Sequence, residues 1–167
     1  MGPHSTLISF LHGVVSIFTG NYGKPGALGP HTSVAPLFNY SAAGREPTDP
    51  VTGGKVISGL VTCNEIADGF LSNHPERSRA MIIESGNPVH SLAESDKFRA
   101  AMRAAELTVV IDVVHTETTE QADWILPASS QYEKAEATFF GANFPANTFH
   151  LRQAILEPLE VTLTEPE

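Results

Sequence analysis

Two short polar stretches, each directly after an apolar run, contain the residues best suited to bind a ligand. The first is Glu84-Ser85-Gly86-Asn87-Pro88. Its glycine allows close approach to the backbone, its asparagine can donate and accept hydrogen bonds, and its proline fixes the exit of the turn. The second stretch runs from Asp112 to Thr118, and its carboxylate could accept paired N–H donors from a guanine edge or a bond from a ribose hydroxyl. Plainer roles stay open, because Gly-Asn-Pro is a common turn and an aspartate after a strand often caps a turn or a helix.

The elements before and between these stretches place them at one edge of a sheet. Ala80-Met81-Ile82-Ile83-Glu84 and Leu107-Thr108-Val109-Val110-Ile111-Asp112 are short apolar runs typical of buried parallel strands. Between them, Ser91 and Glu94 predict a capping box for a helix with an apolar stripe formed by Phe98, Ala101, Met102 and Ala105. Thr118 and Gln121 predict a capped helical turn before a third strand, Trp124-Ile125-Leu126. The pattern predicts an α/β fold, a parallel sheet with flanking helices and a right-handed crossover, whose ligand edge lies at the carboxyl ends of the strands.

The first half of the chain has a different character. Apolar residues recur at helical spacing from Ser5 to Phe18, and Thr19-Gly20-Asn21 is a plausible C-terminal cap, so residues 1–20 should form a helix that belongs to a larger domain. Frequent glycine and proline predict a loop-rich segment over residues 21–78. The α/β subdomain should then occupy residues 79–167.

Composition narrows the function classes. A formal net charge of -9 argues against binding to nucleic acid, and no apolar stretch is long enough for membrane insertion. The single cysteine, Cys63, cannot support a disulfide framework or an iron–sulfur cluster, and we expect it to be a buried, inert thiol in a cytoplasmic protein. The seven histidines show no metal-ligand spacing, so no metal site is predicted.

Five stretches occur in order along the chain: Thr19-Gly20-Asn21-Tyr22-Gly23-Lys24-Pro25-Gly26, Glu84-Ser85-Gly86-Asn87-Pro88, Val110-Ile111-Asp112 with Thr116-Glu117-Thr118, Ala122-Asp123-Trp124-Ile125-Leu126-Pro127-Ala128, and Glu133-Lys134. In type and spacing they resemble successive motifs of the DMSO reductase family of molybdopterin oxidoreductases, among them formate dehydrogenases. The resemblance implies a Rossmann-like domain that binds one guanosine arm of a bis(molybdopterin guanine dinucleotide) cofactor containing molybdenum or tungsten. It implies cofactor contacts at Gly86, Asn87, Ile111, Asp112 and Lys134. The sequence departs from the family after Lys134, where Ala135-Glu136-Ala137-Thr138 replaces the usual Glu-Gly.

The resemblance covers only a middle portion of the family's polypeptide. In full-length members, the iron–sulfur cysteines and the metal ligand lie upstream and a barrel domain lies downstream, so those domains are the implied partners. We therefore expect this segment to contribute no catalytic residue, to bind no metal or cofactor alone, and to self-associate through uncovered apolar surface. A second interpretation stays open, in which the chain is a non-catalytic scaffold or binding module related to the metal-free domain of the large iron–sulfur subunit of respiratory NADH dehydrogenase. Asp112 and Lys134 favour the first interpretation, since a scaffold needs neither a guanine acceptor nor a cation near the cofactor.

Overall fold

The computed structural model describes residues 4–29, 47–57, 59–138, 146 and 148–164. The chain divides into two units, Met1–Leu37 with Glu136–Arg152, and Phe38–Ala135 with Gln153–Glu167. This division differs from the boundaries expected at residues 20 and 78. Part of the segment expected to be loop-rich folds with the α/β unit, and Glu136–Arg152 groups with the N-terminal unit.

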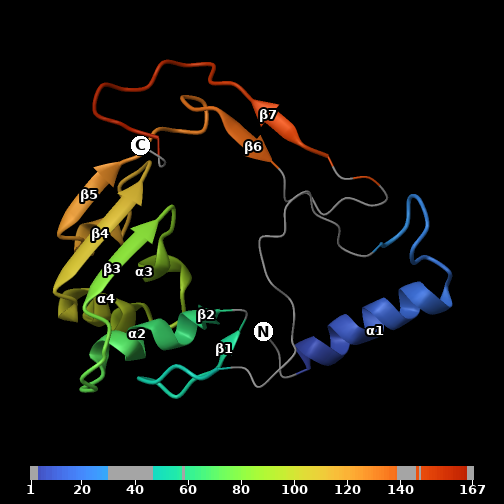
Figure 1. The fold of residues 1–167 in the computed structure, drawn as a ribbon, viewed down its shortest axis with the longest axis horizontal. Helices are drawn as coiled ribbons and strands as arrows, with labels where there is room; N and C mark the ends of the chain where they lie inside the picture. Colours follow the sequence, from blue (N-terminus) through green and yellow to red (C-terminus); the bar gives the residue numbers. More distant parts are fainter. Residues whose placement is uncertain (1–3, 30–46, 58, 139–145, 147, 165–167) are drawn as a thin grey trace. The chain divides into compact units, whose positions relative to one another are not determined.

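The second unit is built on a parallel sheet (Figure 1). Strands β3 (Ala80–Glu84), β4 (Leu107–Asp112) and β5 (Trp124–Pro127) pair in the order β3-β4-β5, with Ala80 opposite Leu107 and Val109 opposite Trp124. All three strands form at the predicted apolar runs. The α/β fold class with a parallel sheet and flanking helices is therefore confirmed.

Helices pack against one face of this sheet and form the core. Helix α4 (Ser95–Ala104) contacts both α2 (Cys63–Leu71) and the short helix α3 (Pro88–Ser91). The buried residues of the core cluster come from all of these helices and from β3 and β4: Ala67, Phe70, Met81, Val89, Phe98, Ala101, Met102 and Val110. Three members of the predicted stripe, Phe98, Ala101 and Met102, are thus confirmed as core residues, while Ala105 packs at the edge of the cluster.

The predicted capping box is wrong. Helix α4 begins at Ser95, and Glu94 before it has a left-handed backbone with φ 58° and makes no capping bond through its side chain. The Ser91 hydroxyl instead donates to the carbonyl of Asn87. Leu92 is extended, so the chain ends α3 and turns sharply before α4 begins.

Regular structure also occurs in the segment expected to be loop-rich. Helix α2 supplies Ala67 and Phe70 to the core. The Arg77 guanidinium joins the C-terminal ends of α2 and α4, because it donates to the carbonyls of Phe70 and Ala104. Before α2, β1 (Val56–Ile57) and β2 (Leu60–Val61) form an antiparallel hairpin. The prediction missed α2 because Asn64, Asp68 and Gly69 are weak helix formers. The apolar residues of α2 nevertheless follow helical spacing.

The first unit contains α1 (Ser5–Phe18) and an antiparallel pair, β6 (Glu136–Thr138) and β7 (His150–Arg152). Helix α1 forms over the predicted run from Ser5 to Phe18, with Thr19 as its C-terminal cap. Gly20 follows with φ 69°, the left-handed conformation that glycine adopts most easily. Arg152 forms an ion pair with Glu136 across the strand pair. No residue of α1 is buried, and its exposed side chains include Phe10, Ile17 and Phe18.

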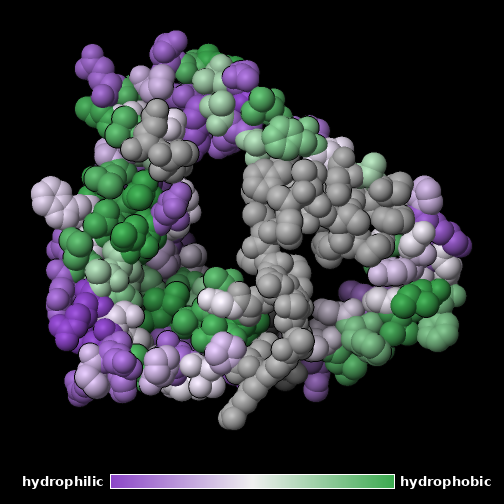
Figure 2. Space-filling model, viewed as in Figure 1, coloured by the Kyte–Doolittle hydropathy of each residue, from purple (hydrophilic) through white to green (hydrophobic). Residues whose placement is uncertain are grey.

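The sheet of the second unit has one open face. Successive side chains of a β-strand point to opposite faces of the sheet. Ile82 and Val109 therefore point away from the helices, because their neighbours Met81 and Val110 belong to the core. Figure 1 shows α3 and α4 behind the strands, and Figure 2 shows hydrophobic residues over the strands on the viewed side. Ile82 is 71% exposed, Trp124 65% and Leu126 49%. Among the described residues, none of the helices is long and apolar enough to cross a lipid bilayer.

Candidate functional site at the carboxyl edge of the sheet

The two polar stretches singled out from the sequence lie side by side at the carboxyl ends of β3 and β4. Glu84, the last residue of β3, pairs with Ile111, and the next backbone N–H, of Ser85, donates to the Ile111 carbonyl at 2.9 Å. The chain then leaves β4 at Asp112, opposite Pro127 at the end of β5. Strand pairing therefore brings four of the predicted residues, Gly86, Asn87, Ile111 and Asp112, to one edge.

The side chain of Asn87 ties the two stretches together. Its Nδ2 donates to Glu117 Oε2 at 2.7 Å, and its Oδ1 accepts from the Thr118 hydroxyl at 2.7 Å. Thr118 is fully buried and also accepts from the backbone N–H of Val89 at 3.1 Å. These bonds cross directly between the two stretches, so the edge is a connected structure.

Glu117 is the charged member of this connection. The bond from the Asn87 amide is the main cause that lowers the pKa of Glu117 below its ordinary value, and the backbone N–H of Glu117 adds to the effect. His90 Nδ1 lies 3.5 Å from Glu117 Oε1, and both side chains are largely exposed. Glu117 is therefore ionised at neutral pH, with Oε2 accepting from Asn87 and Oε1 lying near His90.

The first loop contains one residue with a left-handed backbone. The residue with a left-handed backbone is Ser85, with φ 51°, and not Gly86. A Cβ added at Gly86 would meet Glu84 O at 3.7 Å and Pro88 Cδ at 3.8 Å, which are ordinary contact distances. The fold therefore does not require glycine at position 86, and what its small size offers is space above the loop.

Asp112 stabilises the turn that follows β4. Its Oδ1 accepts from the backbone N–H of Val113 at 2.7 Å and from that of Val114 at 3.4 Å. Oδ2 has no hydrogen-bond partner among the described residues, and the side chain is only half-buried. The carboxylate thus serves the turn with one oxygen and presents the other at the edge.

Lys134 lies on the segment that leaves the same edge after β5. The Ala128 N–H donates to the Asp112 carbonyl at 3.1 Å, and the chain continues through a turn in which Glu133 Oε2 accepts from the Ser130 N–H at 2.7 Å. Glu133 Oε1 also accepts from the Leu159 N–H at 3.0 Å. The Ser130 side chain, followed by the Ser130 and Leu159 N–H groups, lowers the pKa of Glu133. The half-buried Lys134 therefore follows a firmly held residue, although neither the strand pairing nor the Asn87 bonds join it to the other four predicted residues.

The sequence assigned a different role to Thr118 and no role to Glu117. Thr118 was predicted to cap the helical turn η1 (Thr119–Gln121), but η1 has no side-chain capping bond and Thr118 bonds to Asn87 and Val89 instead. Glu117 was given no role beyond its place in the Thr116-Glu117-Thr118 stretch.

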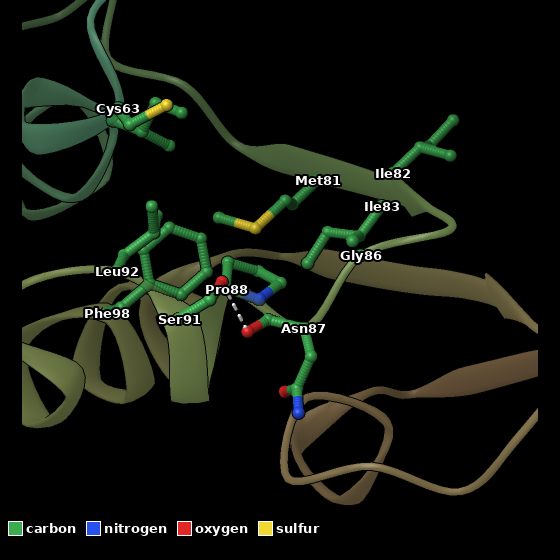
Figure 3. Close-up of a pocket in the computed structure, with 11 residues that line it drawn as sticks. Cys63, Met81, Ile82, Ile83, Gly86, Asn87, Pro88, Ser91, Leu92 and Phe98 are labelled. Carbon is green, nitrogen blue, oxygen red and sulfur yellow. Dashed lines mark hydrogen bonds between the residues drawn. The ribbon is translucent and has the colours of Figure 1, made fainter.

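A cavity of about 350 Å³ lies beside the first loop, between β3, α2 and α3 (Figure 3). Figure 3 shows Met81 and Ile83 pointing toward it and Ile82 pointing away, with Leu92 and Phe98 on the opposite wall. Cys63 lies at the rim and is exposed, which corrects the prediction that it is buried. The prediction rested on the lack of an activating partner near Cys63 in the sequence, and that does not reveal how far the thiol is covered.

Among the described residues, no group of three or more His, Cys, Asp or Glu side chains could hold a metal ion. The arrangement at the edge suits a ligand that offers N–H donors to a carboxylate and that can approach a loop backbone closely.

Comparison with known proteins identifies the family. A family model described as molybdopterin oxidoreductase matches residues 6–158. A nitrate reductase of Symbiobacterium thermophilum is 38% identical over 79 residues, which are 47% of this chain and 10% of that protein. The thiosulfate reductase molybdopterin-containing subunit PhsA of Salmonella typhimurium is 30% identical over 127 residues, which are 75% of this chain and 14% of that subunit. The chain thus spans a small part of the length of these relatives, and it belongs to the molybdopterin oxidoreductase family.

Proposed function

We propose that the carboxyl edge of the sheet binds the guanosine arm of a molybdopterin guanine dinucleotide, and that the chain acts as one segment of a larger molybdopterin oxidoreductase. The observation that supports this is the pairing of the Ser85–Pro88 loop with the Asp112 turn at adjacent parallel strand ends, joined by the bonds of Asn87. Open parallel sheets bind nucleotides at this edge, where loop backbones and strand-end carboxylates meet.

The residues present fit a guanosine. The half-buried Asp112 has an oxygen that could accept from the N–H groups of a guanine edge, and such charge-assisted bonds are stronger than neutral ones. The backbone N–H groups of Gly86 and Asn87 have no acceptor among the described residues, so they could donate to a sugar or a phosphate oxygen. Ile111 would contribute through its backbone position, and Lys134 would supply a cation for the phosphates.

The Asn87 side chain is already bonded within the protein. Its amide nitrogen and oxygen are both engaged by Glu117 and Thr118. Asn87 would therefore contact the nucleotide through its backbone, while its side chain holds the loop in place.

The remaining parts of the proposal concern the larger enzyme. The cofactor would be a bis(molybdopterin guanine dinucleotide) that supplies the redox chemistry through bound molybdenum or tungsten, and the partners would be the iron–sulfur and barrel domains of the same enzyme. In this proposal the residues of the chain bind and orient the nucleotide arm, and none of them takes part in the redox step. The larger enzyme would be an oxidoreductase.

A scaffold role is the second candidate. It is favoured by the internal use of polar groups at the edge, since Asn87 and Asp112 Oδ1 bond within the protein. A scaffold would keep these bonds for stability and would show no preference for guanine.

Titration of the chain with GDP and with ADP separates the two candidates. We expect weak binding of GDP that shifts the NMR signals of residues 84–91 and 111–118, and weaker binding of ADP. Asp112→Asn keeps an oxygen for the turn but loses the charge, so it should remove about 1.5–3 kcal/mol of guanine preference. Asp123→Asn is the matched control, because Asp123 lies before β5 and bonds to Thr108 N at the opposite edge. A guanine preference that persists in Asp112→Asn, or the absence of any preference in the unaltered chain, would favour the scaffold.

A further inference from the structure

We infer that Thr118 is a positioning residue of the nucleotide edge: its hydroxyl orients the side chain of Asn87 and thereby fixes the Ser85–Pro88 loop. The consequence for binding rests on the proposed function, whereas the orientation of Asn87 can be measured without any nucleotide.

The first step is the burial and the bonding of Thr118. The residue is fully buried, and its hydroxyl lies 2.7 Å from Asn87 Oδ1 and 3.1 Å from the N–H of Val89. These two partners lie on either side of Pro88 in the chain. One hydroxyl therefore holds the loop both before and after its proline.

The second step fixes the direction of each bond. Ionised Glu117 can only accept, so the Asn87 atom that faces it at 2.7 Å must be the amide nitrogen. The other amide atom, the oxygen, then faces Thr118, so the hydroxyl must donate to it. The same hydroxyl accepts from the Val89 N–H, which can only donate. Each of the three bonds thus joins a donor to an acceptor, and a flipped amide would place the Asn87 oxygen against the Glu117 carboxylate, two acceptors face to face.

The third step concerns the backbone carbonyl of Asn87. Its carbonyl accepts from the Ser91 hydroxyl at 2.8 Å, shown as the dashed line in Figure 3, and from the Ser91 N–H at 2.9 Å. The side chain and the carbonyl are thus both held, while the backbone N–H of Asn87 has no acceptor among the described residues. Loss of the Thr118 hydroxyl would free the side chain, leave Val89 without an acceptor, and let the loop turn away from the orientation that suits a ligand.

Thr118→Val and Thr118→Ser in the full chain test this inference. Valine has the shape of threonine without the hydroxyl, whereas serine keeps the hydroxyl. The first readout is the side-chain amide signal of Asn87 in nitrogen–proton NMR spectra without nucleotide. We expect Thr118→Val to move this signal toward that of a solvent-exposed asparagine, and Thr118→Ser to leave it close to its original position.

The second readout is the affinity for GDP. Thr118→Val should weaken binding about two- to tenfold, the range that one net hydrogen bond provides, and Thr118→Ser should restore it to within about twofold. If Thr118→Val does not fold, Asn87→Ala breaks the same bond from its half-buried end and should weaken GDP binding by a similar factor.

The outcomes are distinguishable. An unchanged Asn87 signal in Thr118→Val, or a changed signal with unchanged GDP affinity, would overturn this inference and leave the proposed function standing. If the unaltered chain does not bind GDP, the proposed function fails and the role of Thr118 in binding fails with it, whatever the Asn87 signal shows.

Discussion

At the scale of single residues, the carboxylate of Glu117 links the second polar stretch to the first through Asn87 and lies close to His90. Its pKa is lowered, with the Asn87 bond as the main cause. A carboxyl group whose pKa is lower in the folded than in the unfolded protein stabilises the fold above its unfolded pKa. That contribution is lost as the pH falls through the folded pKa.

We therefore predict that acid weakens the connection between the two stretches. Below the ordinary glutamate pKa of about 4.3 the Glu117 bond to Asn87 should lose its charge and weaken progressively, and the free energy of unfolding should fall. Glu117→Gln keeps an oxygen acceptor at every pH, so its stability should depend less on pH between about 3 and 5. Denaturant unfolding at a series of pH values measures this, with Glu120→Gln in the exposed part of the same turn as the control. Identical pH dependence in Glu117→Gln and the unaltered chain would contradict the prediction.

The types and positions of the residues predicted the carboxyl edge of the sheet but not all of its hydrogen bonds. Gly86, Asn87 and Asp112 were picked out because they follow apolar strands, and parallel pairing brings them together. The roles of Glu117 and Thr118 depend on which atoms face each other across the edge, and neighbours along the chain do not reveal that. Whether an aspartate caps a turn or binds a ligand was left open, and Asp112 Oδ1 does cap the turn.

At the scale of elements, the two faces of the sheet differ in their contribution to stability. Met102 of α4 is 2% exposed within the core, whereas Ile82 of β3 is 71% exposed on the open face. Met102→Ala should lower the free energy of unfolding by about 2–5 kcal/mol, because it removes packed atoms and leaves a cavity. Ile82→Ala should cost about 0.5 kcal/mol or less, as expected for an exposed position. Urea unfolding of both variants checks this, and similar losses would show that the open face is covered in solution.

The strands were predictable because their signal is local. Each is a short apolar run, and in β4 most residues are also β-branched, such as Val109, Val110 and Ile111. The start of α4 was not predictable in this way. Ser91 and Glu94 have the spacing of a capping box, yet Leu92 is extended and Glu94 is left-handed, since α3 must end before α4 can pack against the sheet. Tertiary packing decided that boundary.

At the scale of the whole molecule, the chain exposes much apolar surface. Helix α1 buries no residue, and its Phe10 and Phe18 are 66% and 86% exposed, while the open face of the sheet adds Trp124 at 65%. Monomeric soluble proteins rarely expose large contiguous apolar patches, because such patches promote association.

We predict that the purified chain self-associates and binds a hydrophobic dye. Phe10→Glu removes an apolar side chain from α1 and adds a charge, so it should reduce both dye fluorescence and the proportion of larger species in sedimentation experiments. Ser9→Glu adds the same charge beside it and keeps the aromatic side chain, which makes it the matched control. A chain that stays monomeric at high concentration and binds no dye would contradict the expectation.

The order of the strands also has a consequence for the speed of folding. Ala80 pairs with Leu107 and Val109 with Trp124, so the partners in the sheet lie 27 and 15 residues apart, whereas Ala128 pairs with Leu163, 35 residues away. Contacts between residues close in sequence lose less chain entropy and form sooner. The sheet, with Asp112 at its edge, would therefore form a nucleus first. The segment around Leu163 would join it later, so that a nucleotide could meet the edge before the chain has finished folding.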